Sequence, residues 1–503
     1  MKKLIYNLLI SFLLVGMVGC YDDKGNYDYL PVPNIQLTAE ESQYVTQFDT
    51  LRIPVKAELD GMSESDFDFT WRMWPNTVQG DTVKKVISTS KDLIYRVSDV
   101  PGSYTLVLSC CNKHTDVNTY KTFKVSVSGT ISEGWMVLHE KDGKTDFDLI
   151  MTPYFSNRYK EDKILSNLYE TVNGEQLEGR GVRISSYFAI GRYQYVMVLT
   201  ETGGVRLQST TMQKVYDIPT LMLDKKPLKI QNYFFYDYYW CLGNGNEVII
   251  SDGRFYINKL LGGGYTEPIL KDGETYRCAA YAPKWLWTFQ GVMYDELHSR
   301  FLGVTGNMLT VTPLPKANGR QFDWNNMNAT MKYMDTGFKN YDYALMQDKD
   351  THKYGLYVLN FDVKDNFDVA MYEADNCPEL DKAKYYAIGN RGNIFYYATD
   401  KDIYIYDYAG SNTGRKAYTL ANGNEKITGM KILKPCIDRF INNHPYNNKV
   451  LILSTYNEST KEGKIYMYYI NESNGNIDMA SEKVFGGFGE ILDMDYNIPK
   501  YGA

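Results

Sequence analysis

Alternating apolar and polar residues, separated by turn signals, dominate the first part of the chain. The clearest runs are residues 50–55, 67–71, 104–108 and 123–127. Strict alternation in several short runs over about 100 residues predicts an immunoglobulin-like β-sandwich. Trp71 falls within it, where a tryptophan packs in the core between two sheets. We therefore expect a sandwich domain over residues 31–130.

A longer repeat runs from residue 131 to the C-terminus. An apolar, β-branched run leads into a short polar turn and a second strand, and this unit recurs about every 50 residues. Its turns lie at Gly143, Gly204, Gly253, Gly306, Gly355, Asp402 and Gly463. Units of this size that contain only strands predict an all-β fold, a β-propeller with four strands in each blade. Seven turns favour seven blades, with six or eight as alternatives. An irregular series of hairpins is the other alternative, since no WD- or kelch-type signature repeats.

The last residues of the chain complete this pattern. Residues 427–432 have the pattern of an inner strand, and residues 491–496 repeat that pattern with no blade after them. The first blade, which begins at Trp135, has no such strand of its own. We expect the C-terminal segment to supply it, because closing the ring removes sheet edges that invite aggregation. Residues 131–503 are thus predicted to be one propeller domain closed by its C-terminal strand.

The N-terminus has the pattern of an export signal. Two lysines precede an apolar run at residues 4–15, and the segment ends in Met17-Val18-Gly19-Cys20. The run is too short to span a membrane and predicts a signal peptide over residues 1–19. A small residue before a cysteine at this point resembles a bacterial lipobox, so we expect Cys20 to be lipidated and residues 20–30 to form a polar tether. An ordinary signal peptide with a coincidental cysteine is the alternative.

Composition narrows the function classes. The 503 residues are 44% hydrophobic and 23% charged, values that exclude disordered, collagen-like and coiled-coil proteins. A mean hydropathy of -0.40 argues against a polytopic membrane protein. The chain has 45 Tyr against 21 Phe and 7 Trp, and tyrosine suits both pleated sheets and amphipathic binding surfaces. A net charge of -7 argues against nucleic acid as a partner.

Catalytic and metal-binding signatures are missing from the sequence. It contains no nucleophile elbow, no HExxH helix and no P-loop. The five histidines lie far apart, and the six cysteines besides Cys20 match no zinc spacing, so buried free thiols are expected. Acidic pairs such as Asp348/Asp350 and Asp400/Asp402 offer structural calcium as an alternative, but none fits a calcium-binding loop. We therefore expect no enzyme activity, no metal site and no cofactor.

Aromatic clusters are the candidate ligand-binding features. They lie within residues 233–240, 281–287 and 324–343, in connections expected to open onto one rim of the ring. Aromatic rings stack on sugar faces or hold peptide side chains. The candidate residues are Tyr238, Trp240, Tyr281, Trp285, Trp287 and Trp324. Packing between blades is the alternative for the tryptophans, and it is the better interpretation for the alternating Tyr404, Tyr406 and Tyr408.

Four segments carry a resemblance to a known family. They are YDDKGNYDY at 21–29, DFTWRMW at 68–74, PGSYTLVLS at 101–109 and SEGWMVLHEKDG at 132–143. Together they resemble the PKD-like family of Bacteroidota surface lipoproteins, and the acidic pair after Cys20 resembles the surface-export signal of such lipoproteins.

This resemblance implies a context. Proteins of this kind are found beside SusC/SusD-type outer-membrane nutrient importers. It implies a lipid-anchored protein on the outer-membrane surface that captures an oligomeric nutrient, an oligopeptide in preference to a glycan, or docks on the importer. A propeller hydrolase or lyase acting on peptide or polysaccharide is one alternative, and a structural or adhesive surface protein is another.

Overall fold

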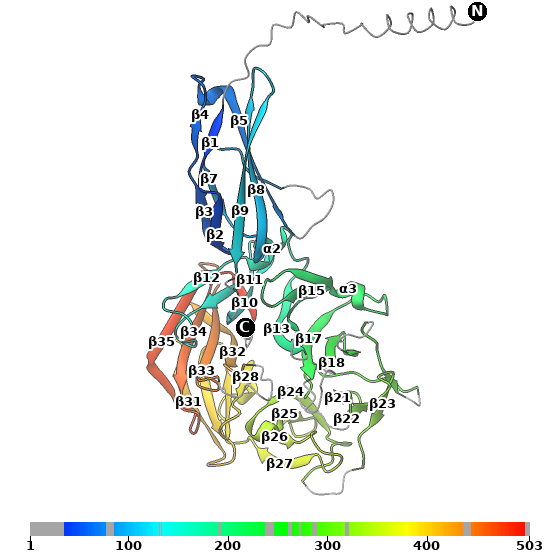
Figure 1. Ribbon diagram of the computed structural model, residues 1–503. Helices are drawn as coiled ribbons and strands as arrows, with labels where there is room; N and C mark the ends of the chain where they lie inside the picture. Colours follow the sequence, from blue (N-terminus) through cyan, green and yellow to red (C-terminus); the bar gives the residue numbers. More distant parts are fainter. Residues whose placement is uncertain are drawn as a thin grey trace, which may run out of the picture. The chain divides into compact units, whose positions relative to one another are not determined.

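The computed structural model is all-β and divides into two compact units (Figure 1). The first includes residues 51–95 and 103–125, and the second includes the chain from residue 126 onward. The structure describes residues 35–76, 85–129, 131, 133–189, 193–236, 246–259, 264–270, 273–283, 289–316, 321–435 and 444–497. The predicted signal peptide and tether therefore lie outside the described residues. No helix among the described ranges is long and apolar enough to cross a membrane.

The first unit has the strands that the alternation predicts. Its largest sheet has the order β2-β9-β8-β5-β6, and β1 pairs with β4 and β3 with β7. The strands are β1 (Gln36–Thr38), β2 (Ser42–Thr46), β3 (Thr50–Ile53), β4 (Lys56–Glu58), β5 (Phe67–Pro75), β6 (Lys85–Ser88), β7 (Leu93–Arg96), β8 (Gly102–Asn112) and β9 (Asn118–Ser128). Trp71 is fully buried, its Nε1 donates to the Ser90 carbonyl at 2.9 Å, and its ring lies 5.2 Å from that of Phe123. The prediction of a core tryptophan is confirmed.

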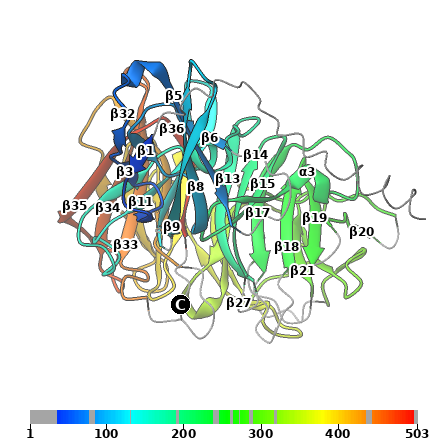
Figure 2. The same cartoon turned by 45° about the horizontal axis from the view of Figure 1, so that its top comes forward.

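Seven sheets of three or four strands form the described part of the second unit. The first two contain β10 (Gly134–Lys141), β11 (Lys144–Met151), β12 (Lys163–Leu165) and β36 (Glu490–Asn497), then β13 (Gly181–Ala189), β14 (Tyr193–Thr200), β15 (Gly203–Gln208) and β16 (Lys214–Asp217). The next two contain β17 (Ile230–Tyr236), β18 (Asn246–Ser251) and β19 (Arg254–Lys259), side by side in Figure 2, then β20 (Ile269–Leu270), β21 (Gly291–Asp295), β22 (Arg300–Val304) and β23 (Thr310–Pro313).

The last three sheets follow the same chain order. They contain β24 (Ala329–Thr336), β25 (Asp342–Asp348), β26 (Tyr354–Leu359) and β27 (Asp368–Glu373), then β28 (Tyr385–Ile388), β29 (Ile394–Ala398), β30 (Asp402–Asp407) and β31 (Thr413–Thr419), then β32 (Glu425–Ile432), β33 (Val450–Asn457), β34 (Glu462–Ile470) and β35 (Ile477–Phe488). Two short helices, α2 (Leu168–Asn173) and α3 (Ile218–Leu221), lie in connections. Every predicted turn position falls in a hairpin turn or in the first two residues of the following strand, so the repeat is confirmed.

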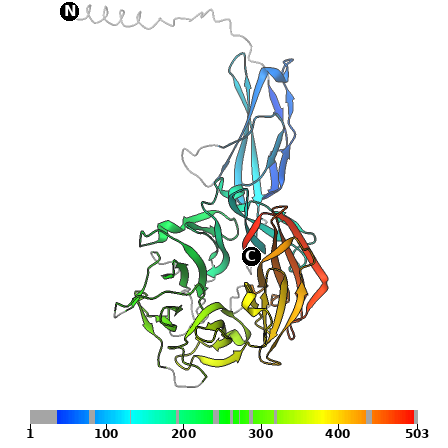
Figure 3. The ribbon, with the colours of Figure 1, turned by 180° about the vertical axis from the view of Figure 1, so that it is seen from behind.

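The C-terminal strand completes the first of these sheets. β36 runs antiparallel to β10, with Trp135 opposite Tyr496 and Val137 opposite Met494. Figure 3 shows β36 in red, ending among the sheets of this unit. Ile491, Met494 and Tyr496 are buried there against residues of the first and last sheets. The pairing expected from residues 491–496 is therefore present.

The strands of the second unit are of two kinds, which differ in their burial and in their place in the sheet. Middle strands such as β18 and β29 are buried along their whole length, because neighbouring sheets cover both of their faces. The strands β13, β17, β24, β28, β32 and β36, each at one end of its sheet, instead mix buried and half-exposed positions; we call them the inner strands. Contacts link β36 to β13 and β13 to β17, and they also link β24 to β28, β28 to β32 and β32 to β36.

Tyrosine fills much of the space between the sheets. Tyr397 and Tyr404 stack at 4.9 Å between ring centroids, and Tyr343 lies 5.3 Å from Tyr408. Tyr404, Tyr406 and Tyr408 are all buried in one cluster between the fifth and sixth sheets. The interpretation of these three as packing residues is confirmed.

Candidate functional site

A cavity of about 150 Å³ lies where the inner strands meet. Its polar lining comes from all six inner strands and from the segments that follow β20 and β32. The polar lining residues are Arg183, Asn232, Tyr281, Tyr333, Asp335, Tyr386, Lys431, Lys434 and Asp495. No two neighbouring sheets supply this set alone, so the cavity exists only when the sheets are assembled.

A recurring β-bulge aims these side chains. The register of β13, β17, β24 and β36 with the adjacent strand shifts by one residue, and the first residues after the shift are Arg183, Asn232, Tyr333 and Asp493. A bulge turns the next side chain away from the regular alternation. The first three of these residues line the cavity, and Asp493 bonds to two lining residues.

Asp493 joins two charged residues of the lining, Arg183 and Lys431. Its carboxylate lies 3.4 Å from Arg183 and 2.8 Å from Lys431, and it accepts a hydrogen bond from the Ile184 amide at 3.0 Å. Burial alone raises the pKa of Asp493, but Arg183 and Lys431 outweigh it and hold the pKa below its usual value. For Lys431, burial and the nearby Arg183 lower the pKa. Asp493 is therefore ionised and compensated by two cations.

A second ion pair lies on the same lining. Lys434 Nζ donates to Asp335 at 2.6 Å and to the Thr336 carbonyl at 2.9 Å. Asp495 accepts from the Ser186 amide at 3.1 Å. Burial lowers the pKa of Arg183, but the attraction of Asp493 and Asp495 is larger and leaves it raised. The cavity thus presents fixed charges of both signs.

Three tyrosines form an aromatic wall beside these charges. The ring of Tyr333 lies 5.5 Å from that of Tyr281 and 5.5 Å from that of Tyr386. Tyr333 donates to Asp335 at 3.3 Å, and Tyr386 to the Ala383 carbonyl at 2.9 Å. Burial raises the pKa of all three phenols, so they are protonated at neutral pH.

One polar atom of the lining has no partner. Arg183 Nε is buried and makes no hydrogen bond to any other described residue. An unpaired buried donor costs about 1–3 kcal/mol, which a ligand acceptor or an ordered water in the cavity would offset. The arrangement can therefore bind a small polar group, orient it with charges of both signs and cover one of its faces with aromatic rings.

The aromatic residues predicted to bind a ligand lie in different surroundings. Tyr281 lines the cavity. Trp324 does not lie on a rim: it is 1% exposed, its Nε1 donates to the Pro315 carbonyl at 2.7 Å, and it packs edge-on against Phe367. The expectation of a ligand-facing position is wrong for Trp324, because its indole fills the core between two sheets. The remaining candidates, Tyr238, Trp240, Trp285 and Trp287, lie outside the described residues, as does Cys20.

Within the described ranges, histidine, cysteine and acidic residues do not converge on one site. Four histidines each lie beside a carboxylate in a different place: His114, His139, His298 and His444. Asp348 caps its own turn by accepting from the Thr351 amide at 2.7 Å. In the described part of the chain, no group of three or more metal-ligating side chains lies together, and the four cysteines found there are free thiols.

Sequence reasoning missed most of the cavity. Its five charged residues are spread from residue 183 to residue 495 and lie on or directly after strands of different sheets. A weak signal exists: Asp493 and Asp495, like Tyr333 and Asp335, are polar residues two apart on a strand, and such residues share one face. Which face a strand turns to the interior depends on its neighbours.

Comparison with known proteins gives a family match and a fold likeness. Residues 20–181 match the model of a PKD-like family, so the chain contains a PKD-like domain in an all-β architecture. A quinonprotein alcohol dehydrogenase-like protein from Bacteroides thetaiotaomicron has 15% identity and a TM-score of 0.51, over 91% of this chain and 96% of that chain. This likeness shows fold alone. The polysaccharide lyase Uly1 has 10% identity and a TM-score of 0.25, over 77% of this chain and 85% of its own, too weak for an argument. No curated protein matches the chain.

Proposed function

We propose that the second unit is a seven-bladed β-propeller whose inner cavity binds a ligand without transforming it. Seven sheets in chain order, completion of the first sheet by β36, and the contact of β36 with both β13 and β32 support the propeller. The fold likeness over 91% of the chain is consistent with it. In this arrangement the inner strands surround the central channel.

The lining of the cavity carries the ligand assignment. Arg183, Lys434 and Asp335 place charges of both signs beside a wall of tyrosines. A peptide end offers an ammonium or a carboxylate together with a side chain, and it complements this lining better than a neutral sugar does. A cavity of about 150 Å³ suits one residue of an oligomer. We therefore favour an oligopeptide whose end residue enters the cavity.

The protonation states favour binding over catalysis. A hydrolase or lyase needs a general base within reach of the substrate, with a pKa near the working pH. The pKa values of Tyr281, Tyr333 and Tyr386 are raised by burial, away from that range. The Asp493 carboxylate is already held by two cations. The cavity accordingly has the chemistry of a binding site.

The proposed setting is the outer surface of the outer membrane. The lipobox-like end of the leader, the acidic pair after Cys20 and the match of residues 20–181 to a PKD-like family support a lipid-anchored surface protein. In this proposal it serves a SusC/SusD-type TonB-dependent importer, either by capturing an oligopeptide or by docking on the importer.

A binding experiment tests the ligand assignment. The purified full-length protein is titrated calorimetrically with defined tripeptides and with matched neutral trisaccharides. We expect saturable binding of peptides, weakened at least tenfold in Arg183→Met and unchanged in Lys160→Met, an exposed lysine outside the cavity. Equal binding by the Arg183 variant, or preference for the saccharides, contradicts the peptide assignment.

A second experiment tests the importer assignment. The native protein is extracted in mild detergent and its complexes are identified by mass spectrometry. We expect a TonB-dependent channel to copurify in stable proportion. Repeated isolation of the protein without such a channel counts against the accessory role and leaves the binding assignment to be judged by the titrations.

A further inference from the structure

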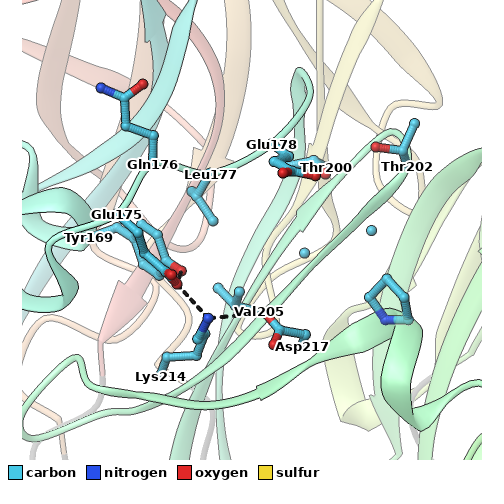
Figure 4. A pocket seen from close by; sticks show the side chains of 13 residues that line it. Tyr169, Glu175, Gln176, Leu177, Glu178, Thr200, Thr202, Val205, Lys214 and Asp217 are labelled. Carbon is cyan, nitrogen blue, oxygen red and sulfur yellow. Dashed lines mark hydrogen bonds and ion pairs between the residues drawn. The ribbon is translucent and has the colours of Figure 1, made fainter.

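A second hollow of about 340 Å³ lies between the first two sheets of the second unit, away from the inner cavity. Figure 4 shows its polar groups, which come from the loop after α2, the hairpin between β14 and β15, and β16. We call it the outer groove. It shares no lining residue with the inner cavity, so its ligand does not depend on the function proposed above.

At one end of the outer groove, the charged side chains pair with one another. Lys214 Nζ lies 2.5 Å from Glu175 and 3.3 Å from Asp217, and Glu175 also accepts from the Tyr169 hydroxyl. The hydrogen bond that Lys214 donates to Glu175 holds the pKa of Glu175 below its usual value and raises the pKa of Lys214. Glu175 is therefore ionised, and the formal charges of Glu175, Asp217 and Lys214 give this end a net charge of about -1.

At the other end of the outer groove, no described cation pairs with the acidic side chain. Glu178 is exposed at the groove, and no cation pairs with it among the described residues. Thr200 and Thr202 line the same end. Thr200 is 0% exposed, and its Oγ1 makes no hydrogen bond to any described residue. A buried hydroxyl without a partner at the wall of a hollow is an observation independent of the acidic charge.

The backbone around this end is held in place. Thr145 Oγ1 donates to the Gly179 carbonyl at 2.9 Å and accepts from the Gly181 amide at 3.1 Å. Gly179 has a φ of +84°, and a Cβ there would lie 3.0 Å from Thr202 Oγ1. Only glycine allows this close approach without strain. The loop therefore sets Glu178 beside the two threonines on a fixed frame.

We propose that the outer groove binds a primary ammonium group, as in a lysine side chain or a peptide N-terminus. An ammonium is a compact cation with three donors, and Glu178, Thr200 and Thr202 offer a carboxylate and two hydroxyl oxygens to receive them. The net negative charge of the groove favours a cation, and Leu177 and Val205 supply an apolar wall for an alkyl chain. A planar guanidinium fits three separate acceptors less well.

The test uses a matched pair of probes on the full-length protein. Nα-acetyl-lysine methylamide and its Nε-acetylated form differ only in the ammonium group, and binding of each is measured by calorimetry at neutral pH and low salt. We expect the amine to bind and the acetylated form to bind with an affinity at least tenfold lower. Added salt weakens it further, because the recognition is ionic.

Four variants locate the interaction. Glu178→Gln is expected to weaken binding of the amine at least tenfold and Thr200→Val severalfold, while Glu201→Gln, an exposed glutamate on the same hairpin outside the groove, leaves it unchanged. Thr200→Ser restores the affinity, which separates the hydroxyl from any packing effect. No saturable binding, equal binding of both probes, or full affinity in Glu178→Gln overturns the proposal.

Discussion

The middle strands and the inner strands of the second unit differ in what surrounds them. β18 and β33 are covered on both faces and are buried almost throughout. β32 and β36 interrupt their buried positions with half-exposed ones, among which are Lys431, Asp493 and Asp495. This difference indicates that the buried middle strands contribute most of the stability of the sheets. The inner strands instead carry the polar groups that can contact a ligand.

Deleting residues 489–503 tests this comparison most severely. The deletion removes β36 and leaves β10 as an open edge, with Ile491, Met494 and Tyr496 lost from the core. At about 1.5–3 kcal/mol for each buried side chain, we expect a loss of about 5 kcal/mol or more. Thermal unfolding and size-exclusion chromatography measure it; an unchanged melting temperature and monomer peak contradict the role assigned to β36.

Leu453→Ala in β33 tests the middle strands. Leu453 is fully buried between two sheets, so truncation leaves a cavity, and we expect a loss of about 3 kcal/mol. Urea unfolding measures the free energy, and peptide titration measures the binding. We expect affinity for the inner cavity to stay within about twofold of wild type where the variant is folded. A variant that is stable but does not bind contradicts the division between the two kinds of strand.

Asp493→Asn tests the charged inner edge. It leaves Arg183 and Lys431 without their shared carboxylate, and we expect the free energy of unfolding to fall by about 2 kcal/mol, less than for a fully buried ion pair because all three side chains are partly exposed.

The pH dependence of the same variant has a definite sign. The folded-state pKa of Asp493 is lowered, so its contribution is complete above the unfolded pKa of about 4 and is lost as the pH falls through the folded value. The wild type should therefore lose more stability than the variant on acidification below about pH 4. Urea unfolding at a series of pH values measures both; parallel curves contradict the assignment.

Tyr333→Phe has the smallest expected effect on stability. It removes the hydroxyl that donates to Asp335, at a cost of about 1 kcal/mol or less, and keeps the ring. Peptide affinity at the inner cavity should fall severalfold. Tyr404→Phe, whose ring packs between sheets, is the matched control and should bind as wild type does. Equal affinities in the two variants would remove Tyr333 from the binding wall.

Local features of this chain were predictable to a useful degree. The strands around Trp71, the recurring hairpins and the return of β36 to β10 all follow from periodicity, because alternation and turn residues act within a few positions. Of the residues that line the inner cavity, only Tyr281 was predicted from the sequence as a candidate. Trp324 was misplaced, since an aromatic residue before a strand is equally compatible with a rim and with the space between two sheets.

The sequence by itself determined an all-β chain with an alternating sandwich region, a strand repeat of about 50 residues and a high tyrosine content, because these depend on residue types and short-range spacing. Only the tertiary structure decided which polar residues meet. Arg183 and Asp493 lie 310 positions apart and become neighbours when the last strand joins the first sheet. Bulges in the inner strands then set the direction of their side chains, and that direction depends on pairing between strands rather than on the residues of one strand.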